Sequence, residues 1–487
     1  MMRLGTFLRV VTAATFISGL TLAAAPQDAR SPYVEDPDPL VRQKIDEWQD
    51  LKLGLLMHWG TYSQWGIVES WSLCSEDEPW CRRSMDDYAT YKAAYEKLQT
   101  TFNPVRFDPE RWARAARDAG MRYVVFTTKH HDGFSMFDTH ETDYRITSPN
   151  TPFSSNPRAD VTKAIFDAFR AEGFKVGAYF SKPDWRSPDY WWPYFATPDR
   201  NPNYDIKKYP ERWARFVKFT HAQIDELMSR YGRVDILWLD GGWVRPRTDA
   251  EIKAEINKPD YKFARIQSQD IDMPGLVAAA RAKQPGLIVV DRDVPGPYQN
   301  YLTPEARVPP QPLPYPWEVP MPMARSWSFV PNDVYKTPRE LIQMLVDVVA
   351  KGGNLLLNIG PGPDGTWHDA AYERLTALGA WMKVNSEAIY ATRPVAPYAD
   401  GQVRFTRAKN GTVYAIYLPR ATEDVTTLPR EITIATPAPA ANGVLTLLGT
   451  GRTIPWDRSP AGIVAHIPAG LAPPNADAWV FRLSTGK

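Results

Sequence analysis

Val234-Asp-Ile-Leu-Trp-Leu-Asp-Gly-Gly-Trp243 is the stretch that decides the fold. An apolar run rich in branched and aromatic residues ends in a carboxylate and two glycines, a pattern typical of a buried parallel strand that delivers Asp240 to a turn. Ligands bind at that end of the strands in parallel barrels, and Gly241 and Gly242 allow a tight turn or the close approach of a substrate. The alternative is an aspartate that only stabilises the turn or caps the next helix.

Strand-like and helix-like segments alternate on both sides of this stretch. Apolar strand patterns occur at Leu53–His58, Tyr123–Thr128, Lys175–Ser181, Leu287–Arg292, Ala324–Phe329 and Asn354–Ile359. Helical patterns occur at Pro109–Ala119, Asp160–Glu172, Pro210–Tyr231, Met273–Lys283, Thr337–Ala350 and Ala370–Val384. Repeated strand–helix units predict a parallel sheet with helices outside, and so many of them favour a (β/α)8-like barrel of the TIM type over an open sheet.

The two ends of the chain differ from this repeating part. Arg3 and Arg9 precede an apolar run that ends in three alanines before Pro26. This pattern predicts a removable signal peptide over residues 1–25 and a mature protein exported to the periplasm or the exterior. After Arg393, short strand patterns split by Asn-Gly and Pro-Ala turns predict an antiparallel β-sandwich over residues 394–487. Residues 26–393 are then expected to form the barrel.

Composition limits the function classes. The 487 residues carry a formal net charge of +1, which offers no electrostatic case for nucleic acid or an acidic membrane surface as partner. After the signal, no stretch is long and apolar enough to predict a membrane span. The 18 Trp and 23 Tyr residues exceed what packing alone usually requires, and aromatic faces suit sugars, although many of these rings will be core.

Cys74 and Cys81 are the two cysteines of the chain. In an oxidising compartment they can close a small disulfide loop; the alternative is a pair of free thiols. No histidine lies at ligand spacing beside them, so a metal site is not expected there.

Polar side chains recur where the predicted strands end. They are His58, His130, His131, Tyr179 and Arg292. Because the carboxyl ends of barrel strands meet at one face, these groups are expected to gather around Asp240.

Several of these residues have a second interpretation. His58 can be a core histidine, and Arg292 can be a structural ion-pair partner of Asp291 or Asp293. His130 and His131 can ligate a metal, but adjacent strand residues point to opposite faces, so one shared ion fits poorly without a turn between them. Neutral histidines that bond sugar hydroxyls are favoured, and no metal is predicted.

The connection between Asp293 and Pro331 is unusually rich in proline and aromatic residues. Its prolines restrict φ, and its aromatic side chains favour an ordered, functional loop. Glu318 beside Trp317 would be a carboxyl group in a partly apolar setting near a second carboxylate. Both effects raise a pKa and suit a general acid. The alternative is a solvated loop acid.

Five motifs occur in order between Leu53 and Tyr390 and carry a resemblance. They are Met57-His58-Trp59-Gly60, Lys129-His130-His131-Asp132-Gly133-Phe134, Trp238-Leu239-Asp240-Gly241, Trp317-Glu318 followed by Ser326-Trp327, and the segment from Gly352-Gly353-Asn354 through Asn358-Ile-Gly360 to Gly365. Together they resemble the α-L-fucosidases of glycoside hydrolase family 29.

The resemblance implies an exo-acting, retaining hydrolase that removes terminal α-L-fucose through a covalent fucosyl-enzyme and needs no cofactor. Asp240 stands in the position of the nucleophile. Glu318 stands in the position of the acid/base, and Glu305 in Thr-Pro-Glu is the second candidate for that role. The expected partner is a fucosylated oligosaccharide or glycoconjugate.

The resemblance also implies a set of substrate-binding residues. These are His58, Glu69, Trp71, His130, His131, Tyr179, Arg292 and Trp327. Glu69 and Trp71 stand where the family has a Glu directly followed by Trp, but Ser70 intervenes here. The alternatives are an α-L-galactosidase, a linkage-restricted fucosidase, or a catalytically silent fucose-binding protein.

Overall fold

A computed structural model describes residues 33–74, 83–85, 87–197, 199–435 and 443–484 of the chain. The predicted signal peptide lies outside these residues, and so does Cys81, whereas Cys74 is buried. Signal cleavage and the disulfide therefore stay predictions. Within the described ranges, no helix combines the length and the apolarity needed to cross a lipid bilayer.

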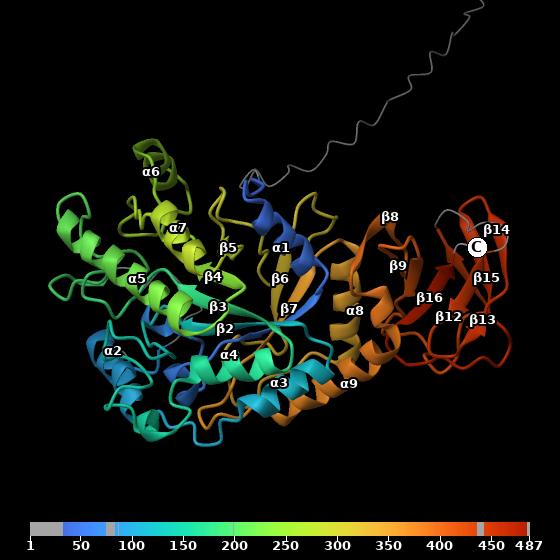
Figure 1. Cartoon of the computed structure of the whole chain (residues 1–487), viewed down its shortest axis with the longest axis horizontal. Coiled ribbons are helices and arrows are strands. Elements are labelled where there is room, and N and C mark those ends of the chain that lie inside the picture. Colours follow the sequence, from blue (N-terminus) through green and yellow to red (C-terminus); the bar gives the residue numbers. More distant parts are fainter. Residues whose placement is uncertain (1–32, 75–82, 86, 198, 436–442, 485–487) are drawn as a thin grey trace, which may run out of the picture.

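A parallel sheet of seven strands lies at the centre of the larger part of the molecule (Figure 1). Its strands are β1 (Leu53–Met57), β2 (Tyr123–Lys129), β3 (Lys175–Ser181), β4 (Ile236–Asp240), β5 (Ile288–Asp291), β6 (Glu318–Pro322) and β7 (Asn354–Ile359). Their order across the sheet is β5-β4-β3-β2-β1-β7-β6. The expected parallel sheet is confirmed, with seven strands rather than eight among the described residues.

The sheet is strongly curled. Strands β4 and β6 stand five places apart in the strand order, which in a flat sheet would separate them by about 24 Å. Even so, Trp238 Nε1 of β4 donates a hydrogen bond to Glu318 Oε1 of β6 at 3.3 Å. The sheet therefore encloses an interior, as a barrel does.

Strand β6 is where the sequence prediction was wrong. Ala324–Phe329 forms no strand, and the strand lies instead at Glu318–Pro322, inside the predicted loop. Pro320 and Pro322 have no N–H to donate to a neighbouring strand, so a sequence that contains them does not predict a strand. They are tolerated here because β6 is at the edge of the sheet.

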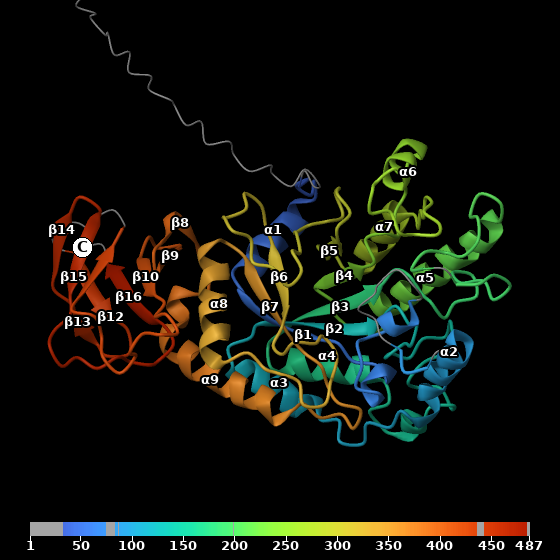
Figure 2. The same ribbon diagram turned by 180° about the vertical axis from the view of Figure 1, so that it is seen from behind.

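Helices surround the sheet, and most of them pack on its outer face (Figures 1 and 2). They are α1 (Pro39–Gln49), α2 (Tyr88–Glu96), α3 (Pro109–Asp118), α4 (Val161–Ala171), α5 (Pro210–Arg230), α6 (Asp249–Ile256), α7 (Met273–Lys283), α8 (Pro338–Ala350) and α9 (Asp369–Asn385). Their starts follow sequence signals. The Asp160 side chain accepts from the backbone N–H of Lys163 at α4, and Thr337 and Glu340 form a capping box at α8.

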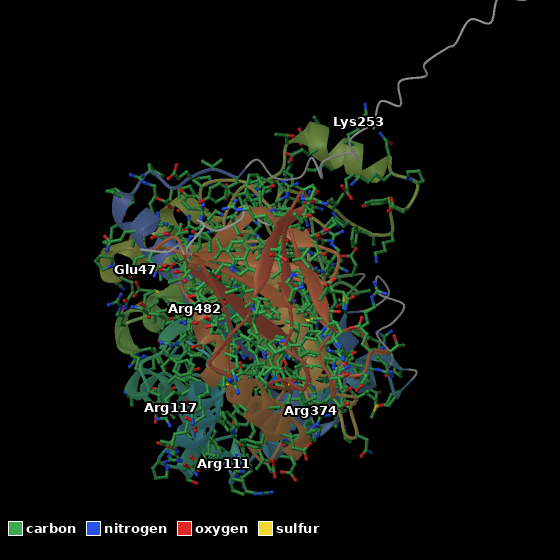
Figure 3. The ribbon with its side chains drawn as sticks, turned by 90° about the vertical axis from the view of Figure 1, so that its right-hand side faces the viewer. Glu47, Arg111, Arg117, Lys253, Arg374 and Arg482 are labelled. Atoms are coloured by element: carbon green, nitrogen blue, oxygen red, sulfur yellow. The ribbon has the colours of Figure 1, made fainter. Side chains whose placement is uncertain are left out.

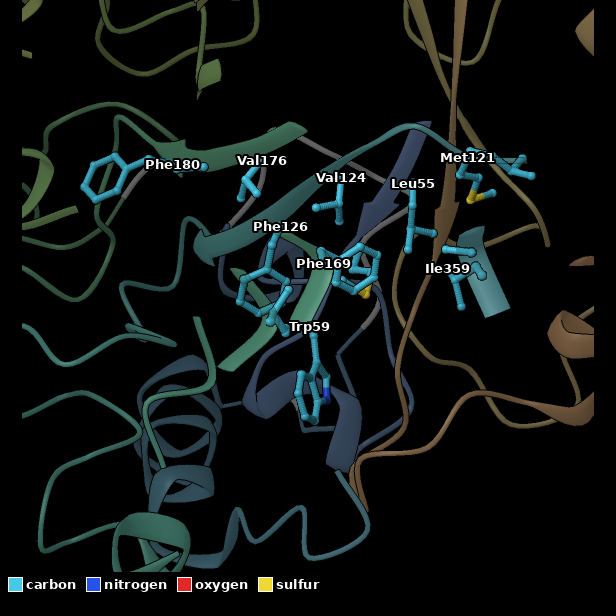
Figure 4. Packing of buried hydrophobic residues seen from close by; sticks show 14 of the residues in the cluster. Leu55, Trp59, Met121, Val124, Phe126, Phe169, Val176, Phe180 and Ile359 are labelled. Atoms are coloured by element: carbon cyan, nitrogen blue, oxygen red, sulfur yellow. The ribbon is translucent and has the colours of Figure 1, made fainter. Parts of the chain in front are cut away.

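The strands are apolar on both faces because both faces are buried. Leu55, Val124 and Phe126 belong to the outer core between sheet and helices, which Figure 4 shows together with Phe169 of α4. Their neighbours Leu56 and Val125, with Tyr179 and Trp238, belong to the inner core enclosed by the sheet. This explains why the strands read as continuous apolar runs.

The C-terminal part consists of antiparallel strands and lies to one side of α8 and α9 (Figure 1). One sheet has the order β13-β12-β16-β10-β9-β8 and the other β11-β15-β14. The strands are β8 (Thr392–Asp400), β9 (Val403–Ala408), β10 (Val413–Tyr417), β11 (Glu431–Ile434), β12 (Val444–Leu447), β13 (Arg452–Thr453), β14 (Trp456–Ser459), β15 (Gly462–His466) and β16 (Trp479–Ser484). Both sheets contribute to one hydrophobic cluster, for example Ile434 and Phe481.

Candidate active site

A pocket of about 600 Å³ opens at the carboxyl ends of the parallel strands. It brings together most of the residues singled out in the sequence, namely His58, Glu69, Trp71, His130, Tyr179, Asp240, Arg292 and Trp327. Leu56, Trp238 and Pro320 also line it from strands β1, β4 and β6. A smaller cavity of about 300 Å³, beside α1 and the amino ends of β4 and β5, contains none of these residues.

Asp240 is the last residue of β4 and is held by several donors. Tyr179 Oη donates to Asp240 Oδ2 at 2.6 Å, while Arg292 Nη1 and the Gly241 N–H donate to Oδ1 at 3.2 and 2.7 Å. Burial alone would raise the pKa of Asp240. The Arg292 guanidinium and the Tyr179 hydrogen bond outweigh burial and hold this pKa well below its usual range. Asp240 is therefore an oriented, ionised carboxylate.

The two glycines after Asp240 allow a tight turn, as the sequence suggested. Gly241 has φ +90°, and a Cβ there would lie 2.4 Å from Pro183 Cδ. A Cβ on Gly242 would lie 2.7 Å from the Arg292 carbonyl oxygen. Larger residues would displace the loop that carries Arg292, and with it a partner of Asp240.

Asn358 of β7 positions two pocket residues. His58 Nδ1–H donates to Asn358 Oδ1 at 2.9 Å, and Asn358 Nδ2 donates to the Trp327 carbonyl oxygen at 2.7 Å. Burial lowers the pKa of His58 to about 4, so its ring is neutral at neutral pH. The asparagine of the Asn-Leu-Leu-Leu-Asn motif thus acts on the site through its neighbours.

Ser70 contacts residues of the site, although in the sequence it stood out only as the residue that separates Glu69 from Trp71. Its hydroxyl lies 2.6 Å from His130 Nδ1 and accepts from the Asp132 N–H at 3.0 Å. The backbone of Ser70 has φ +26°, a sparsely populated region for a residue with a side chain. The strained Ser70 lets Glu69 and Trp71 both line the pocket despite the extra residue between them.

Glu69 is a buried carboxyl group in this pocket, with 4% of its surface exposed. Its Oε2 has no hydrogen-bond partner among the described residues. Burial, together with the nearby charge of Asp240, raises the pKa of Glu69 to about 8. Glu69 is therefore protonated at neutral pH and can both donate and accept hydrogen bonds.

His131 touches the nucleophile candidate from behind the pocket surface. His131 Nε2 lies 3.6 Å from Asp240 Oδ2, and the rings of His130 and His131 are 4.4 Å apart. The expectation that the two rings diverge was wrong, because β2 ends at Lys129 and a turn follows. Burial lowers the pKa of His131 to about 3, so it too is neutral.

His130, His131 and Asp240 have ligand atoms within 4.8 Å of one another, a spacing that could hold a metal ion. The surroundings fit a cation poorly, because Arg292 places a positive charge against Asp240 Oδ1 and Tyr179 donates to Oδ2. The grouping suits neutral imidazoles beside a charged carboxylate better than a metal centre.

Arg292 connects Asp240 to a second carboxyl group. Its Nη1 donates to Asp240 and its Nη2 donates to Glu305 Oε2. Asp291 is bound by Lys182 instead, and Asp293 Oδ2 lies 3.9 Å from Arg292 Nε. Of the two alternative ion-pair partners of Arg292, Asp291 is therefore excluded, whereas Asp293 is within ion-pair distance. One guanidinium holds Asp240 and Glu305 near each other in the pocket.

Glu318, the favoured acid/base candidate from the sequence, does not line the pocket. It is the first residue of β6 and pairs in register with Asn354, the first residue of β7. Asp240 is the last residue of β4, so the two carboxyl groups belong to opposite ends of the sheet. The sequence could not show this, because it offered no sign that a strand begins at Glu318.

Glu318 is fully buried beneath the pocket floor. Tyr123 Oη donates to Glu318 Oε2 at 2.6 Å and Trp238 Nε1 donates to Oε1 at 3.3 Å. Burial raises the pKa of Glu318 to about 7. The high pKa expected for this residue is present, but it belongs to a buried strand position rather than to a solvated loop.

Sequence reasoning missed the outer part of the pocket. Its residues are Arg200, Trp243, Arg245, Arg247, Glu255, Lys258, Phe263 and Asp293. Most of them belong to the segment between β4 and α7. The signal that could have found them is the length of this segment, since long loops after barrel strands build binding sites.

Comparisons with known proteins agree with this architecture. A family model described as Alpha-L-fucosidase matches residues 20–387. The tissue alpha-L-fucosidase of Mus musculus is 28% identical over 474 residues, which cover 93% of this chain and 94% of the relative. The structure of alpha-L-fucosidase isoenzyme 1 from Paenibacillus thiaminolyticus has a TM-score of 0.72 at 29% identity, covering 92% of this chain and 100% of the other. The complex of Thermotoga maritima alpha-fucosidase with fucose has a TM-score of 0.68 at 26% identity, covering 93% and 100%.

Proposed function

We propose, from the premise that this chain belongs to the α-L-fucosidase family of glycoside hydrolases, that it removes terminal α-L-fucose from glycans by a retaining double displacement. The observation that carries the proposal is the Arg292 guanidinium, which contacts Asp240 and Glu305 in one pocket. A retaining mechanism uses two carboxyl groups about 5 to 5.5 Å apart, one on each side of the bond that is cleaved.

In the first step, Asp240 attacks the anomeric carbon while the bond to the glycosidic oxygen breaks. Glu305 donates its proton to that oxygen, so the rest of the glycan leaves as an alcohol. In the second step, Glu305 removes a proton from water, the water oxygen attacks the anomeric carbon, and Asp240 is released as a carboxylate. The low pKa of Asp240 suits the nucleophile, because attack requires the ionised form.

Glu305 suits the acid/base role by its position. Its side chain is 44% exposed, so it faces the pocket mouth, where the leaving group of an exo-acting enzyme points. Glu69 is 4% exposed and lies where the sugar ring enters, so its role is to bind hydroxyls.

The other pocket residues fit a 6-deoxy sugar. His58, His130 and Glu69 are neutral groups that can exchange hydrogen bonds with hydroxyls. Trp327, whose ring lies 5.3 Å from that of His58, offers an apolar wall to the methyl group. An extra hydroxyl on that carbon, as in L-galactose, would face the indole without a partner and bind less well.

Hydrolysis of 4-nitrophenyl α-L-fucoside, followed by proton NMR, tests the proposal. The expected first product is α-L-fucose, and the matching α-L-galactoside should be cleaved more slowly. β-L-Fucose as the first product would contradict retention. Faster cleavage of the galactoside would make the protein an α-L-galactosidase, and no cleavage of either would make it a fucose-binding protein.

We also propose that the protein acts after export, to the periplasm or the exterior. The support is the N-terminal sequence, in which two arginines precede an apolar run and three alanines before Pro26. N-terminal sequencing of protein from the exported fraction should begin near Pro26. A mature protein that retains Met1 would refute this.

A further inference from the structure

The outer pocket carries more positive charge than the proposed hydrolysis uses. Arg292 pairs with both carboxylates of the reaction. Four further cationic side chains line the same pocket, namely Arg200, Arg245, Arg247 and Lys258. Three of these belong to the segment between β4 and α7, which includes α6 and stands at the top of the molecule in Figure 1. Figure 3 shows α6 with Lys253 in the same raised position.

Backbone hydrogen bonds hold this segment in place near the pocket. The Arg247 N–H donates to Ser268 Oγ at 2.8 Å, and the Gln269 N–H donates to the Arg245 carbonyl oxygen at 2.9 Å. Gln269 is itself fully buried and donates to Asn201 Oδ1 at 2.7 Å. The positions of Arg245 and Arg247 are thus determined by the fold.

Arg247 is the cation of this set without a direct ion pair among the described residues; burial lowers its pKa, although the more distant charges of Glu255 and Glu251 oppose this effect. Arg245 pairs with Glu251 at 3.0 Å, and Lys258 pairs with Glu255 at 2.7 Å. The Arg247 side chain makes no hydrogen bond or ion pair with any residue that the structure describes, and its Nε is buried without a partner. A partly buried guanidinium without a direct ion pair is costly, so an anion supplied by a ligand would be favoured in contact with it.

An aromatic wall connects these cations to the nucleophile. The rings of Trp71 and Trp243 each lie 5.3 Å from the ring of His131, the neighbour of Asp240. The Arg200 guanidinium lies over the same two rings, 4.8 Å from the centroid of Trp71 and 5.0 Å from that of Trp243. Indole faces of this kind stack on sugar rings, so a sugar linked to fucose would extend along them toward the cations.

We propose that the leaving-group side of the pocket binds an anionic sugar, with a carboxylate or sulfate ester held by Arg247. This inference rests on the proposed fucosidase activity and names the substrate class within it. The guanidinium presents several N–H donors in a planar fork that matches a carboxylate or a sulfate, and hydrogen bonds between charged groups are stronger than neutral ones. The expected substrates are therefore glycans in which fucose is attached to, or next to, a uronic acid or a sulfated sugar.

Two matched pairs of aryl fucosides test the proposal. The first pair is 3-carboxyphenyl and 3-carbamoylphenyl α-L-fucoside, and the second is 3-sulfophenyl and 3-sulfamoylphenyl α-L-fucoside. Within each pair the shape is nearly the same and only the charge differs. The neutral member is the better leaving group, so a preference for the anionic member cannot come from leaving-group chemistry. The two pairs distinguish a carboxylate from a sulfonate, which stands in for a sulfate ester, as the preferred anion.

The wild-type enzyme is expected to have a kcat/KM about tenfold higher for the anionic member of at least one pair, mainly through a lower KM. Arg247→Met should bring this ratio close to one, and Arg247→Lys should keep part of it. Arg265→Met is the matched control, because Arg265 is exposed in the same segment and does not line the pocket. This variant should keep the wild-type ratio.

A ratio near or below one in the wild type for both pairs would overturn the proposal. So would a ratio that Arg247→Met leaves unchanged while its melting temperature matches that of the wild type. If Arg247→Met does not fold, Lys258→Met, which removes another pocket cation, is expected to lower the ratio in its place. Cleavage of neither member, with 4-nitrophenyl α-L-fucoside also inert, would instead mean that the proposed function fails, and this inference would fail with it.

Discussion

Asp240 and Glu318 are two carboxyl groups inside the same curled sheet, one at the pocket and one beneath its floor. Each accepts a hydrogen bond of 2.6 Å from a tyrosine, Tyr179 in one case and Tyr123 in the other. Trp238 lies between them. Its ring stacks on that of Tyr179 with centroids 5.2 Å apart, and its indole N–H donates to Glu318.

The two carboxyl groups differ in pKa because a cation lies beside Asp240 and, within the described part of the chain, none lies beside Glu318. Burial by itself raises the pKa of both, but Arg292 beside Asp240 reverses this effect, and nothing comparable acts on Glu318, whose pKa rises to about 7. Desolvation without a cation therefore favours the protonated form of Glu318, whereas the guanidinium keeps Asp240 ionised despite burial. A raised pKa is thus no sufficient sign of a catalytic acid.

The largest expected effect is on Asp240. Asp240→Gly should lower kcat/KM for 4-nitrophenyl α-L-fucoside by about 10⁴-fold, the order expected when a group that forms a covalent intermediate is removed. Azide should restore turnover by attacking the anomeric carbon directly, giving β-L-fucosyl azide, which NMR identifies. An unchanged far-ultraviolet circular dichroism spectrum controls for folding. Rescue that yields the α-azide would argue against Asp240 as the nucleophile.

The second prediction separates the acid/base candidates. Glu305→Ala should lower kcat/KM by about 10² to 10⁴-fold for fucosides with poor leaving groups. The loss of kcat/KM should be much smaller for fucosides with good leaving groups, because only poor leaving groups need the proton. Glu318→Gln should show no such dependence on the leaving group, since Glu318 is beneath the pocket floor.

A series of aryl fucosides with graded leaving groups measures this difference. Glu69→Gln is the informative comparison, because Glu69 also lines the pocket and is protonated at neutral pH. It should lose activity equally on all leaving groups, as expected for a residue that binds the sugar. If Glu69→Gln and not Glu305→Ala showed the graded loss, the acid/base role would move to Glu69.

A smaller effect is expected from Tyr179→Phe, which removes the hydroxyl that donates to Asp240. The loss of a hydrogen bond to a charged acceptor should cost about tenfold in kcat/KM. That hydrogen bond lowers the pKa of Asp240, so its removal raises this pKa and moves the acidic limb of the kcat/KM profile to higher pH. Activity measured across the acidic range checks the shift. A limb that stays in place or moves to lower pH would contradict the assigned donor.

The smallest expected effect is on stability, and it concerns Glu318. Its pKa is raised from 4.5 to about 7 in the folded protein, so between these values the folded state holds a proton that the unfolded state has lost. The contribution of Glu318 to the free energy of unfolding therefore falls as pH rises through this window and is constant above it. Glu69, with a pKa raised to about 8, contributes a fall of the same sign up to that pH.

Glu318→Gln should remove part of this pH dependence. Urea unfolding at pH 5 and pH 8 measures the difference in unfolding free energy between the two conditions, and the variant should show a smaller one than the wild type. Glu373→Gln, at an exposed position of α9, is the matched control and should keep the wild-type difference. A difference that is equal in all three proteins would mean that Glu318 is ionised in the folded state or already protonated in the unfolded one.

Much of the site could be predicted from the sequence, because the local patterns that mark strand ends also mark the positions of the site residues. An apolar run that ends in Asp240-Gly241-Gly242 is both a strand end and a place for a carboxylate. The histidines after β1 and β2 were found for the same reason. Glu318 was placed in a loop because two prolines hid the strand that it begins. Ser70, Arg200 and Arg247 could not be found, since no local pattern distinguishes them from other loop residues.

The sequence by itself determined the family, the alternation of strands and helices, and the carboxylate at the end of β4. These properties depend on residue types over short spans, where hydrophobic periodicity and motif spacing act directly. Tertiary structure alone decided which carboxyl groups share the pocket with Asp240, because that depends on how far the sheet curls and on which strand ends face each other. It also decided the charge of each group, since a pKa is determined by neighbours that lie far apart along the chain.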